Sequence, residues 1–156
     1  MICIDIPGGA SLRLEHLVLD FNGTLACDGV LLPDVRERLE RLSHTIRVHV
    51  VTADTFNRAR IELADLGCQL RVLESHNQMQ AKLEYVRRLG AERTACVGNG
   101  RNDALMIDAA ELGIAVVQAE GVAVPTLQAA DVVVGDIADA LDLLLHPQRL
   151  VATLRR

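Results

Sequence analysis

The chain of 156 residues has almost no aromatic side chains: it contains no Trp, one Tyr and two Phe. Because half of the residues are nevertheless hydrophobic, the core must be built from Leu, Val, Ile and Ala. The four cysteines are scattered and form no C-x-x-C pair. This pattern favours four reduced thiols in a cytoplasmic protein rather than a disulfide framework.

Several classes of function are excluded by what is missing. No apolar run reaches the roughly 18–20 residues of a transmembrane helix, and the first residues lack the basic and apolar regions of a signal peptide. The net charge of −5 argues against a general binder of nucleic acid or acidic membranes. The five histidines show no metal-ligand spacing. The length suits a single domain, residues 1–156, with one substantial core.

Short apolar runs alternate with amphipathic helical patterns along the chain. The runs predict strands at 17–20, 46–51, 70–73, 94–97, 114–117 and 132–134, and the strand at 70–73 is expected in the core. The helical patterns lie at about 33–42, 54–66, 79–89 and 105–107, from 125, at 137–145 and from 147. Asp54 or Thr55 is expected to cap the second helix. This alternation predicts an α/β fold with a doubly wound, mostly parallel sheet and no large cap domain.

Two hairpins are expected beside this sheet. Residues 2–6 and 12–14 alternate in polarity around the turn Pro7-Gly8-Gly9, which predicts an N-terminal β-hairpin. That hairpin is interpreted either as a plain edge hairpin or as a dimer or sheet-edge contact. Asp28-Gly29 between apolar flanks predicts a small flap, in which Asp28 serves the turn or, as the alternative, touches substrate.

The stretch 17–25 organises the chain. A buried strand ends in Asp20, and Gly23 then lets the backbone turn sharply and approach a ligand. Because open α/β sheets bind ligands at the carboxyl ends of their strands, Asp20 is placed where a nucleophile or a metal ligand would lie. The alternative is an ordinary Asp-x-Asn-Gly turn.

Other polar side chains follow the strands that are expected beside Asp20. Thr52 ends the next strand, and Asn99 and Asp103 follow the strand at 94–97. Lys82, on the preceding helix, is expected to reach the same edge. Carboxylates, a hydroxyl and one Lys suit a phosphate with a divalent cation. As alternatives, Thr52 begins a helix, Lys82 is one more exposed charge, and Asn99-Gly100 is a plain turn.

In these segments the sequence resembles the haloacid dehalogenase (HAD) superfamily of phosphohydrolases. Residues 20–24 (Asp-Phe-Asn-Gly-Thr) resemble its motif D-x-D-x-[TV], and 98–103 resemble G-D-G-x-N-D. Thr52 and Lys82 match its second and third motifs. Within the superfamily, D-x-x-G-T-L and Thr52-Ala53-Asp54 resemble the phosphorylation domain of P-type ATPases, and in particular its soluble, capless, stand-alone relatives.

The resemblance implies a mechanism. Asp20 would form an aspartyl-phosphate on a small phosphorylated substrate, while Thr52 and Lys82 hold the phosphoryl oxygens. Mg²⁺ would be the cofactor. A possible homo-oligomer would close the site, because capless enzymes of this kind often use a neighbouring subunit. The implied ligands of Mg²⁺ are Asp20, the backbone carbonyl of Asn22, Asn99 and Asp103, and the implied remainder of the substrate site is Gly23, Thr24, Ala53 and Asn102.

Two positions depart from the phosphatase pattern. Asn22 stands where phosphatases carry the general acid and base, and an amide cannot transfer that proton. Asn99 stands where the fourth motif has its first Asp, which predicts weaker binding of Mg²⁺. We therefore expect a slow Mg²⁺-dependent phosphohydrolase or phosphotransferase. The alternatives are a non-catalytic phosphate-binding or regulatory module, and an unrelated doubly wound domain that binds a partner.

Overall fold

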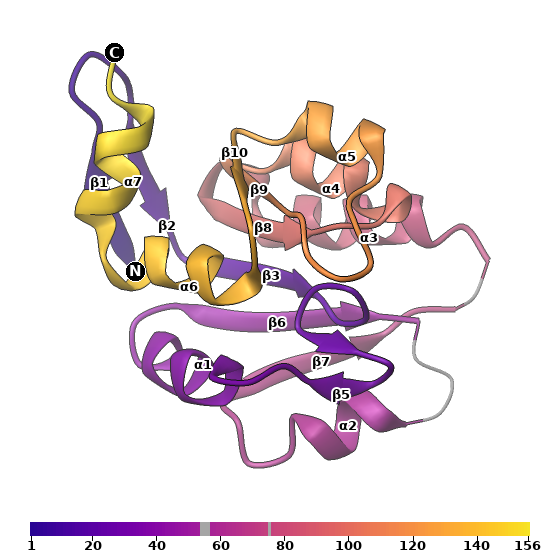
Figure 1. Ribbon diagram of the computed structural model, residues 1–156. Helices are drawn as coiled ribbons and strands as arrows, with labels where there is room; N and C mark the ends of the chain where they lie inside the picture. The colour runs from indigo at the N-terminus through magenta and orange to yellow at the C-terminus, as the bar shows by residue number, and fades with distance from the viewer. Residues whose placement is uncertain (54–56, 75) are drawn as a thin grey trace.

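The computed structural model describes residues 1–53, 57–74 and 76–156. Its centre is a parallel six-stranded sheet in the order β10-β9-β8-β3-β6-β7 (Figure 1). The chain builds the sheet outward from β3 to β7, crosses back to β8, and continues outward to β10. The order therefore reverses between β3 and β8, where doubly wound sheets bind ligands. The strands of this sheet are β3 (His16–Asp20), β6 (Arg47–Thr52), β7 (Cys68–Val72), β8 (Thr94–Gly98), β9 (Leu112–Val116) and β10 (Val132–Val134).

Helices cover both faces of the sheet, as predicted. Alternate residues of β3 point to opposite sides, so that Leu17 and Leu19 join one apolar cluster and Val18 the other. The first cluster lies under α1 (Val35–Ser43) and α6 (Ile137–Leu145), and the second under α3 (Gln78–Leu89) and α4 (Ala104–Ala109). The shorter helical segments are α2 (Arg58–Glu62), α5 (Val124–Ala129), and the 3₁₀ turns η1 (Ala91–Arg93) and η2 (Arg101–Asp103).

Both predicted hairpins are present. In the N-terminal hairpin, β1 (Ile2–Asp5) pairs antiparallel with β2 (Ser11–Leu14). Its buried residues face α7 (Pro147–Leu154), which packs against β1 beside the main sheet (Figure 1). In the flap, β4 (Ala26–Cys27) pairs with β5 (Val30–Leu31). Both turn residues of the flap, Asp28 and Gly29, have positive φ, as a tight hairpin turn requires.

Two expectations about the region after β6 are wrong. The strand β7 is an edge strand, not a core strand, and the side chain of Val72 is 43% exposed. The helix α2 ends at Glu62 rather than near Leu66, because Asp65 takes a left-handed conformation with φ of 66° and breaks the helical path. Asp54 and Thr55, the expected caps, lie outside the described residues. In the described part of the chain, every helix is too short or too polar to span a bilayer.

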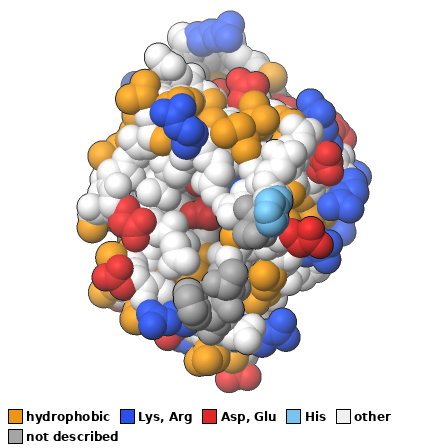
Figure 2. All heavy atoms as spheres, turned by 90° about the vertical axis from the view of Figure 1, so that its right-hand side faces the viewer, with side chains coloured by type: hydrophobic (Ala, Val, Ile, Leu, Met, Phe, Trp, Pro, Cys, Tyr) orange, Lys and Arg blue, Asp and Glu red, His pale blue; other side chains and the backbone are white. Residues whose placement is uncertain are grey.

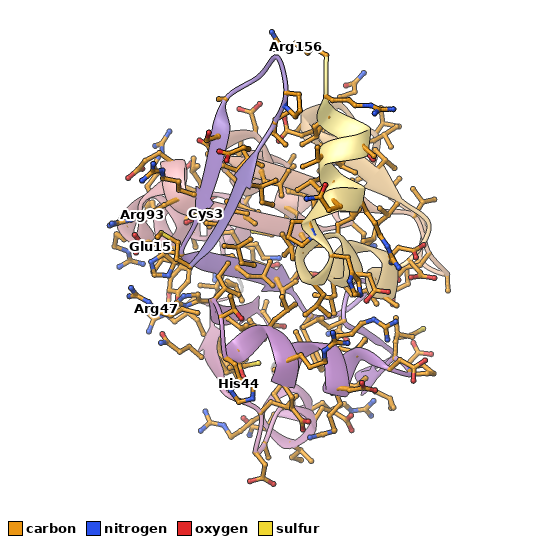
Figure 3. The ribbon with its side chains drawn as sticks, turned by 90° about the vertical axis from the view of Figure 1, so that its left-hand side faces the viewer. Cys3, Glu15, His44, Arg47, Arg93 and Arg156 are labelled. Carbon is orange, nitrogen blue, oxygen red and sulfur yellow. The ribbon has the colours of Figure 1, made fainter. Side chains whose placement is uncertain are left out.

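The edge of the sheet at the amino ends of the strands carries surface charge. Glu15 lies between Arg47 and Arg93, at 3.4 Å and 3.9 Å respectively (Figure 3). All three side chains are partly or largely exposed to solvent. Exposed pairs of this kind contribute little to stability, so these charges form a rim at the surface of this edge.

Candidate active site

The carboxyl ends of β3, β6 and β8 surround a cavity of about 230 Å³. Figure 2 looks onto this edge of the molecule, and acidic side chains are visible in a hollow near the middle of the face. Most of the lining was predicted from the sequence; Gln78, Gly100 and Glu120 were not among the predicted site residues. The lining residues are Asp20, Asn22, Thr52, Ala53, Gln78, Asn99, Gly100, Asn102 and Glu120.

Lys82 joins two carboxylates beside this cavity. Its Nζ donates to Asp20 Oδ1 and to Asp103 Oδ1, each at 2.6 Å, and its side chain is only 1% exposed. Lys82 lies on α3, which faces β8 and brings the side chain across the end of the sheet. A buried ammonium ion needs such partners, since an unpaired charge in the interior is very costly. The alternative of an exposed surface charge is therefore wrong.

The charges of this cluster perturb one another. Burial raises the pKa of Asp20 to about 7, and the negative charge of Asp103 adds to this, against the opposing effects of Lys82 and Thr24. Burial by itself would lower the pKa of Lys82, but the charges of Asp20 and Asp103 raise it above its usual value. The ammonium ion is thus retained, and Asp20 is the group whose charge is most sensitive to its surroundings.

Asp103 organises the loop that follows β8. Its Oδ2 accepts from the backbone N–H groups of Asn99 and Gly100, at 3.1 Å and 2.9 Å. A Cβ on Gly98 would lie 2.6 Å from the Asp103 carboxyl carbon, so only glycine fits there. Asp103 is fully buried and does not line the cavity. Its carboxylate holds both the loop and Lys82.

Thr24 connects the loops after β3 and β8. Its hydroxyl lies 3.2 Å from Asp20 Oδ2 and 3.3 Å from Asn99 Oδ1. Asn99 Nδ2 in turn donates to the Gly121 carbonyl at 2.9 Å. Thr24 is fully buried and is not part of the cavity wall. It supports the two loops from behind.

The other predicted residues take separate positions. Thr52, 3% exposed, ends β6 and lines the cavity together with Ala53. Asn102 also lines it, and its Nδ2 donates to Gln78 Oε1 at 2.8 Å. Gly23 has φ of 82° and lines a neighbouring cavity instead. This left-handed conformation favours glycine, and a Cβ at position 23 would also come within 2.7 Å of the Asn99 amide and Glu120 Oε2.

Two residues after β9 belong to the site and were missed. Gln118 Nε2 donates to the backbone carbonyls of Gly23 and Thr24, both at 2.7 Å, and its Oε1 accepts from the N–H of Ile137. Glu120 lines the cavity beside Asp20. The signal was available, because β9 is one more parallel strand whose carboxyl end meets the same edge.

A second cavity, of about 360 Å³, adjoins the first. It lies between the flap, the loop after β9 and the start of α6, and Glu120 lines both cavities. Its position next to Asp20 gives room for a group attached to a bound phosphate. The lining residues are Gly23, Ala26, Cys27, Leu32, Pro33, Asp34, Gln118, Ala119, Glu120, Asp136, Ile137 and Ala138.

The oxygen donors fit a hydrated divalent cation better than a metal held by protein alone. No group of three or more His, Cys, Asp or Glu side chains in the described ranges is arranged to hold a metal. Three residues with oxygen donors, Asp20, Asn22 and Asn99, do line the cavity. Mg²⁺ keeps several waters and commonly binds one or two carboxylates together with substrate phosphate. The donor set suits that mode.

Known proteins share sequence with this chain. The chain is 46% identical over 79 residues to the uncharacterized protein MJ0073 of Methanocaldococcus jannaschii, a match that covers 48% of this chain and 85% of that protein. It is 27% identical to the phospholipid-transporting ATPase NEO1 of Saccharomyces cerevisiae over 74% of its own length, which spans only 9% of NEO1. No protein-family model matches the chain.

Solved structures share the fold over nearly the whole chain. The cobalt-bound deoxy-D-mannose-octulosonate 8-phosphate phosphatase YrbI of Haemophilus influenzae has a TM-score of 0.71 at 19% identity, covering 92% of this chain and 94% of its own. The 3-deoxy-D-manno-octulosonate 8-phosphate phosphatase of Moraxella catarrhalis, in complex with magnesium, phosphate and KDO, has 0.71 at 15%, covering 91% and 94%. A HAD-superfamily hydrolase structure from Legionella pneumophila has 0.67 at 20%, covering 90% and 87%.

The structure brings together the three residues that resemble the first, second and third motifs. Asp20, Thr52 and Lys82 stand at the ends of β3 and β6 and on α3, around one cavity or its buried wall. The sheet order and the absence of a large cap among the described residues complete the match. The chain therefore belongs to the family of protein MJ0073, and its fold is that of the haloacid dehalogenase superfamily.

Proposed function

We propose that the protein is a Mg²⁺-dependent phosphohydrolase or phosphotransferase that works through an aspartyl-phosphate on Asp20. The observation that carries this proposal is the pair of 2.6 Å contacts from Lys82 Nζ to Asp20 and Asp103. A buried ammonium ion there stabilises the ionised nucleophile and adds positive charge where phosphoryl oxygens would bind.

The chemistry follows from the positions of the side chains. An oxygen of Asp20 attacks phosphorus, and the bond from phosphorus to the leaving-group oxygen breaks. Thr52 and Lys82 hold the phosphoryl oxygens as their charge redistributes. Water then attacks the phosphorus of the aspartyl-phosphate, which releases phosphate and restores Asp20. Gly23, Ala53 and Asn102 shape the substrate site, while Thr24 and Asp103 keep its loops in place.

The Asp20 carboxylate, the backbone of Asn22 and Asn99 would hold Mg²⁺ in the cavity that takes the substrate phosphate. When bound, it neutralises the negative charge of the phosphate. Asp103, the fourth predicted ligand, already accepts from Lys82 and two backbone N–H groups. We therefore propose that the main role of Asp103 is to hold Lys82 in position. Only the lone pairs that these three hydrogen bonds leave free could serve a metal ion.

Asn22 and Asn99 favour slow turnover. A site that relied on position 22 alone for proton transfer would lose general acid–base catalysis, which typically contributes about 10²–10⁴ in rate. The same two amides support the second candidate function, a phosphate-binding or regulatory module without turnover. Both candidates use one binding site, and they differ in whether the bond to phosphorus is broken.

The substrate is proposed to be a small phosphorylated molecule whose leaving group occupies the 360 Å³ cavity beside the flap. Two of the similar structures are phosphatases whose names give a phosphorylated sugar acid, which makes such compounds the first to assay. We further propose that residues 1–156 act as one cytoplasmic domain, and that a second copy of the chain covers the open side of the site.

The test is a phosphatase assay on the wild type and on Asp20→Asn, each with Mg²⁺ and with a chelator. Turnover that requires both Mg²⁺ and Asp20 supports the proposal. Asp108→Asn, an exposed carboxylate on α4, is the matched control and should retain full activity. Equal rates for the wild type and Asp20→Asn would refute the proposal that the protein is an enzyme that uses Asp20 as its nucleophile. Mg²⁺-dependent phosphate binding without turnover would instead establish the second candidate.

A further inference from the structure

The catalytic cavity holds a carboxylate to which the proposed mechanism gives no role. Among the lining residues that the structure describes, only Asp20 and Glu120 carry a titratable side chain. Asp20 is the nucleophile, and the position of the usual proton-transfer group is occupied by the neutral Asn22. Of the described lining residues, Glu120 is therefore the one besides Asp20 whose side chain can carry a transferable proton.

The loop that carries Glu120 is fastened to the site on both sides. Gln118 bonds to the Gly23 and Thr24 carbonyls, and the Gly121 carbonyl accepts from Asn99 Nδ2 at 2.9 Å. Two residues further on, the N–H of Ala123 donates to the Asn99 carbonyl at 2.8 Å. These bonds tie the Glu120 backbone to the loops after β3 and β8, which carry Asp20, Asn22 and Asn99.

The Glu120 side chain reaches the junction of the two cavities. Its Oε2 lies 2.7 Å from the position of a Cβ on Gly23, the residue directly after Asn22. It lines both the cavity of Asp20 and the larger cavity beside the flap. A phosphate ester bound with its phosphorus at Asp20 and its leaving group in the larger cavity would have its bridging oxygen at this junction. A group that protonates the leaving group must lie there.

The Glu120 carboxylate is also free to transfer protons. It is exposed, and it makes no hydrogen bond or ion pair with the rest of the described chain. The other carboxylates of the site are occupied: Asp20 and Asp103 bond to Lys82. A structural role for the Glu120 side chain has no contact to support it.

We propose that Glu120 is the general acid and base of this site, in place of the residue at position 22. This inference rests on the proposed phosphohydrolase function. In the first step, the Glu120 carboxyl gives its proton to the leaving-group oxygen as the bond from phosphorus to that oxygen breaks and the Asp20–phosphorus bond forms. In the second step, the Glu120 carboxylate takes a proton from water as the water oxygen bonds to phosphorus and the Asp20–phosphorus bond breaks.

The test compares Glu120→Gln with the wild type in steady-state and single-turnover assays across pH. We expect kcat to fall by about 10²–10⁴ with little change in KM, and the limb of the pH–rate profile that reports the carboxyl group to disappear. Glu120→Asp should keep part of the rate. The matched control is Glu40→Gln, an exposed carboxylate on α1, which should behave as wild type.

A second-site variant makes the test specific. Asn22→Asp restores a carboxylate at the usual position, so it should recover much of the rate and the lost pH limb in the Glu120→Gln background. A purely structural effect of Glu120 would not be rescued in this way, and failure of that rescue would count against the proposal. Unchanged kcat and pH profile in Glu120→Gln, with turnover still dependent on Asp20, would overturn this inference alone. A wild type without Asp20-dependent turnover would overturn the proposed function as well.

Discussion

The two ends of strand β3 both hold buried polar clusters, and the two clusters differ in charge. At the carboxyl end, Asp20 bonds to Lys82 and so joins a cluster of three charges beside an open cavity. At the amino end, His16 Nδ1 lies 2.9 Å from His49 Nε2, and His49 Nδ1 lies 2.9 Å from the Tyr85 hydroxyl. Burial, together with the positive charge of Arg47, lowers the pKa of both histidines, so this second cluster is neutral.

This difference in charge separates a cluster that stabilises packing from one that stability does not explain. No buried side-chain nitrogen or oxygen in the described residues lacks a hydrogen-bond partner, so both clusters are satisfied. A neutral, closed hydrogen-bond chain mainly fixes packing and orientation. Buried ions gain little net stability against the cost of removing them from water. The charged cluster is thus poorly explained by stability, and its position at the cavity fits the phosphoryl chemistry that we propose.

The largest expected effect on stability and activity comes from removing the charge of Lys82, which lies between the two carboxylates at the carboxyl end of β3. Lys82→Met leaves the Asp20 and Asp103 carboxylates facing each other without a cation, and we expect a loss of about 3–5 kcal/mol in the free energy of unfolding. Activity should fall by about 10²–10³, as for the loss of one stabilising donor. Urea unfolding and phosphatase assays measure the two effects.

The double variant Lys82→Met/Asp103→Asn separates these effects. It removes one of the two repelling carboxylates and should recover part of the stability while activity stays low. Recovery of activity together with stability would show that Lys82 acts only as a structural partner, which contradicts its role at the phosphoryl group.

The next largest effect on the free energy of unfolding is expected from protonation of His49, at the amino end of β3. The pKa of His49 is about 4 in the folded protein, against about 6.5 in an unfolded chain. The unfolded state therefore binds the proton first as the pH falls. The stabilising contribution of neutral His49 is complete above pH 6.5 and is lost progressively down to about pH 4, by about 3 kcal/mol at most. Chemical unfolding at a series of pH values measures it.

Asp20, at the carboxyl end of β3, changes the stability in the opposite direction over the same pH range. The pKa of Asp20 is raised to about 7 in the absence of metal, so its contribution favours the folded state at low pH and weakens as the pH rises towards 7. Measurements in the Asp20→Asn background with a chelator isolate His49. If that variant lost no stability between pH 6.5 and 4, the neutral histidine cluster would be refuted.

A smaller effect is expected from Tyr85→Phe. Removing the hydroxyl leaves a nitrogen of the buried His49 without its partner, which costs about 1–3 kcal/mol. The phosphatase rate should not change, because the variant affects only the amino end of the strand. Thermal unfolding and kcat are the readouts. A loss of activity at unchanged stability would show that the two ends are coupled.

The smallest effect is expected at the exposed rim. Glu15→Gln removes both ion pairs to Arg47 and Arg93, which are 63% and 47% exposed in their side chains. We expect a change within about 0.5 kcal/mol that vanishes at high salt. A change above 1 kcal/mol would mean that surface charge contributes as much here as a buried hydrogen bond does.

Much of the fold could be predicted because its signals are local. Val35, Leu39 and Leu42 lie at helical spacing and are buried on α1, and the strand runs after Asp20 alternate with such helices. The position of β7 could not be predicted in this way, because an apolar run does not reveal whether one or both sides of a strand have neighbours. The early end of α2 depends on the backbone of Asp65, which composition does not specify.

The site shows the same division. Asp20, Thr52 and Lys82 were recognisable because each stands at a motif position next to a strand or on the expected helix. The hydrogen-bond partners of these side chains could not be predicted from the sequence. Whether the Asp103 carboxylate faces a metal or Lys82 depends on its rotamer and on the two backbone N–H groups that it accepts from. Glu120 could not be recognised in this way, because it matches no motif and lies four residues after the end of β9, whereas the predicted residues follow β3, β6 and β8.

The most direct measurement is mass spectrometry of rapidly quenched protein after incubation with Mg²⁺ and a small phosphoryl donor such as acetyl phosphate. We predict a single added phosphoryl group on the peptide that contains Asp20. Treatment with hydroxylamine should remove it, and it should be absent from Asp20→Asn and from metal-free samples. A phosphoryl group on any other residue, or equal labelling in Asp20→Asn, would contradict this prediction.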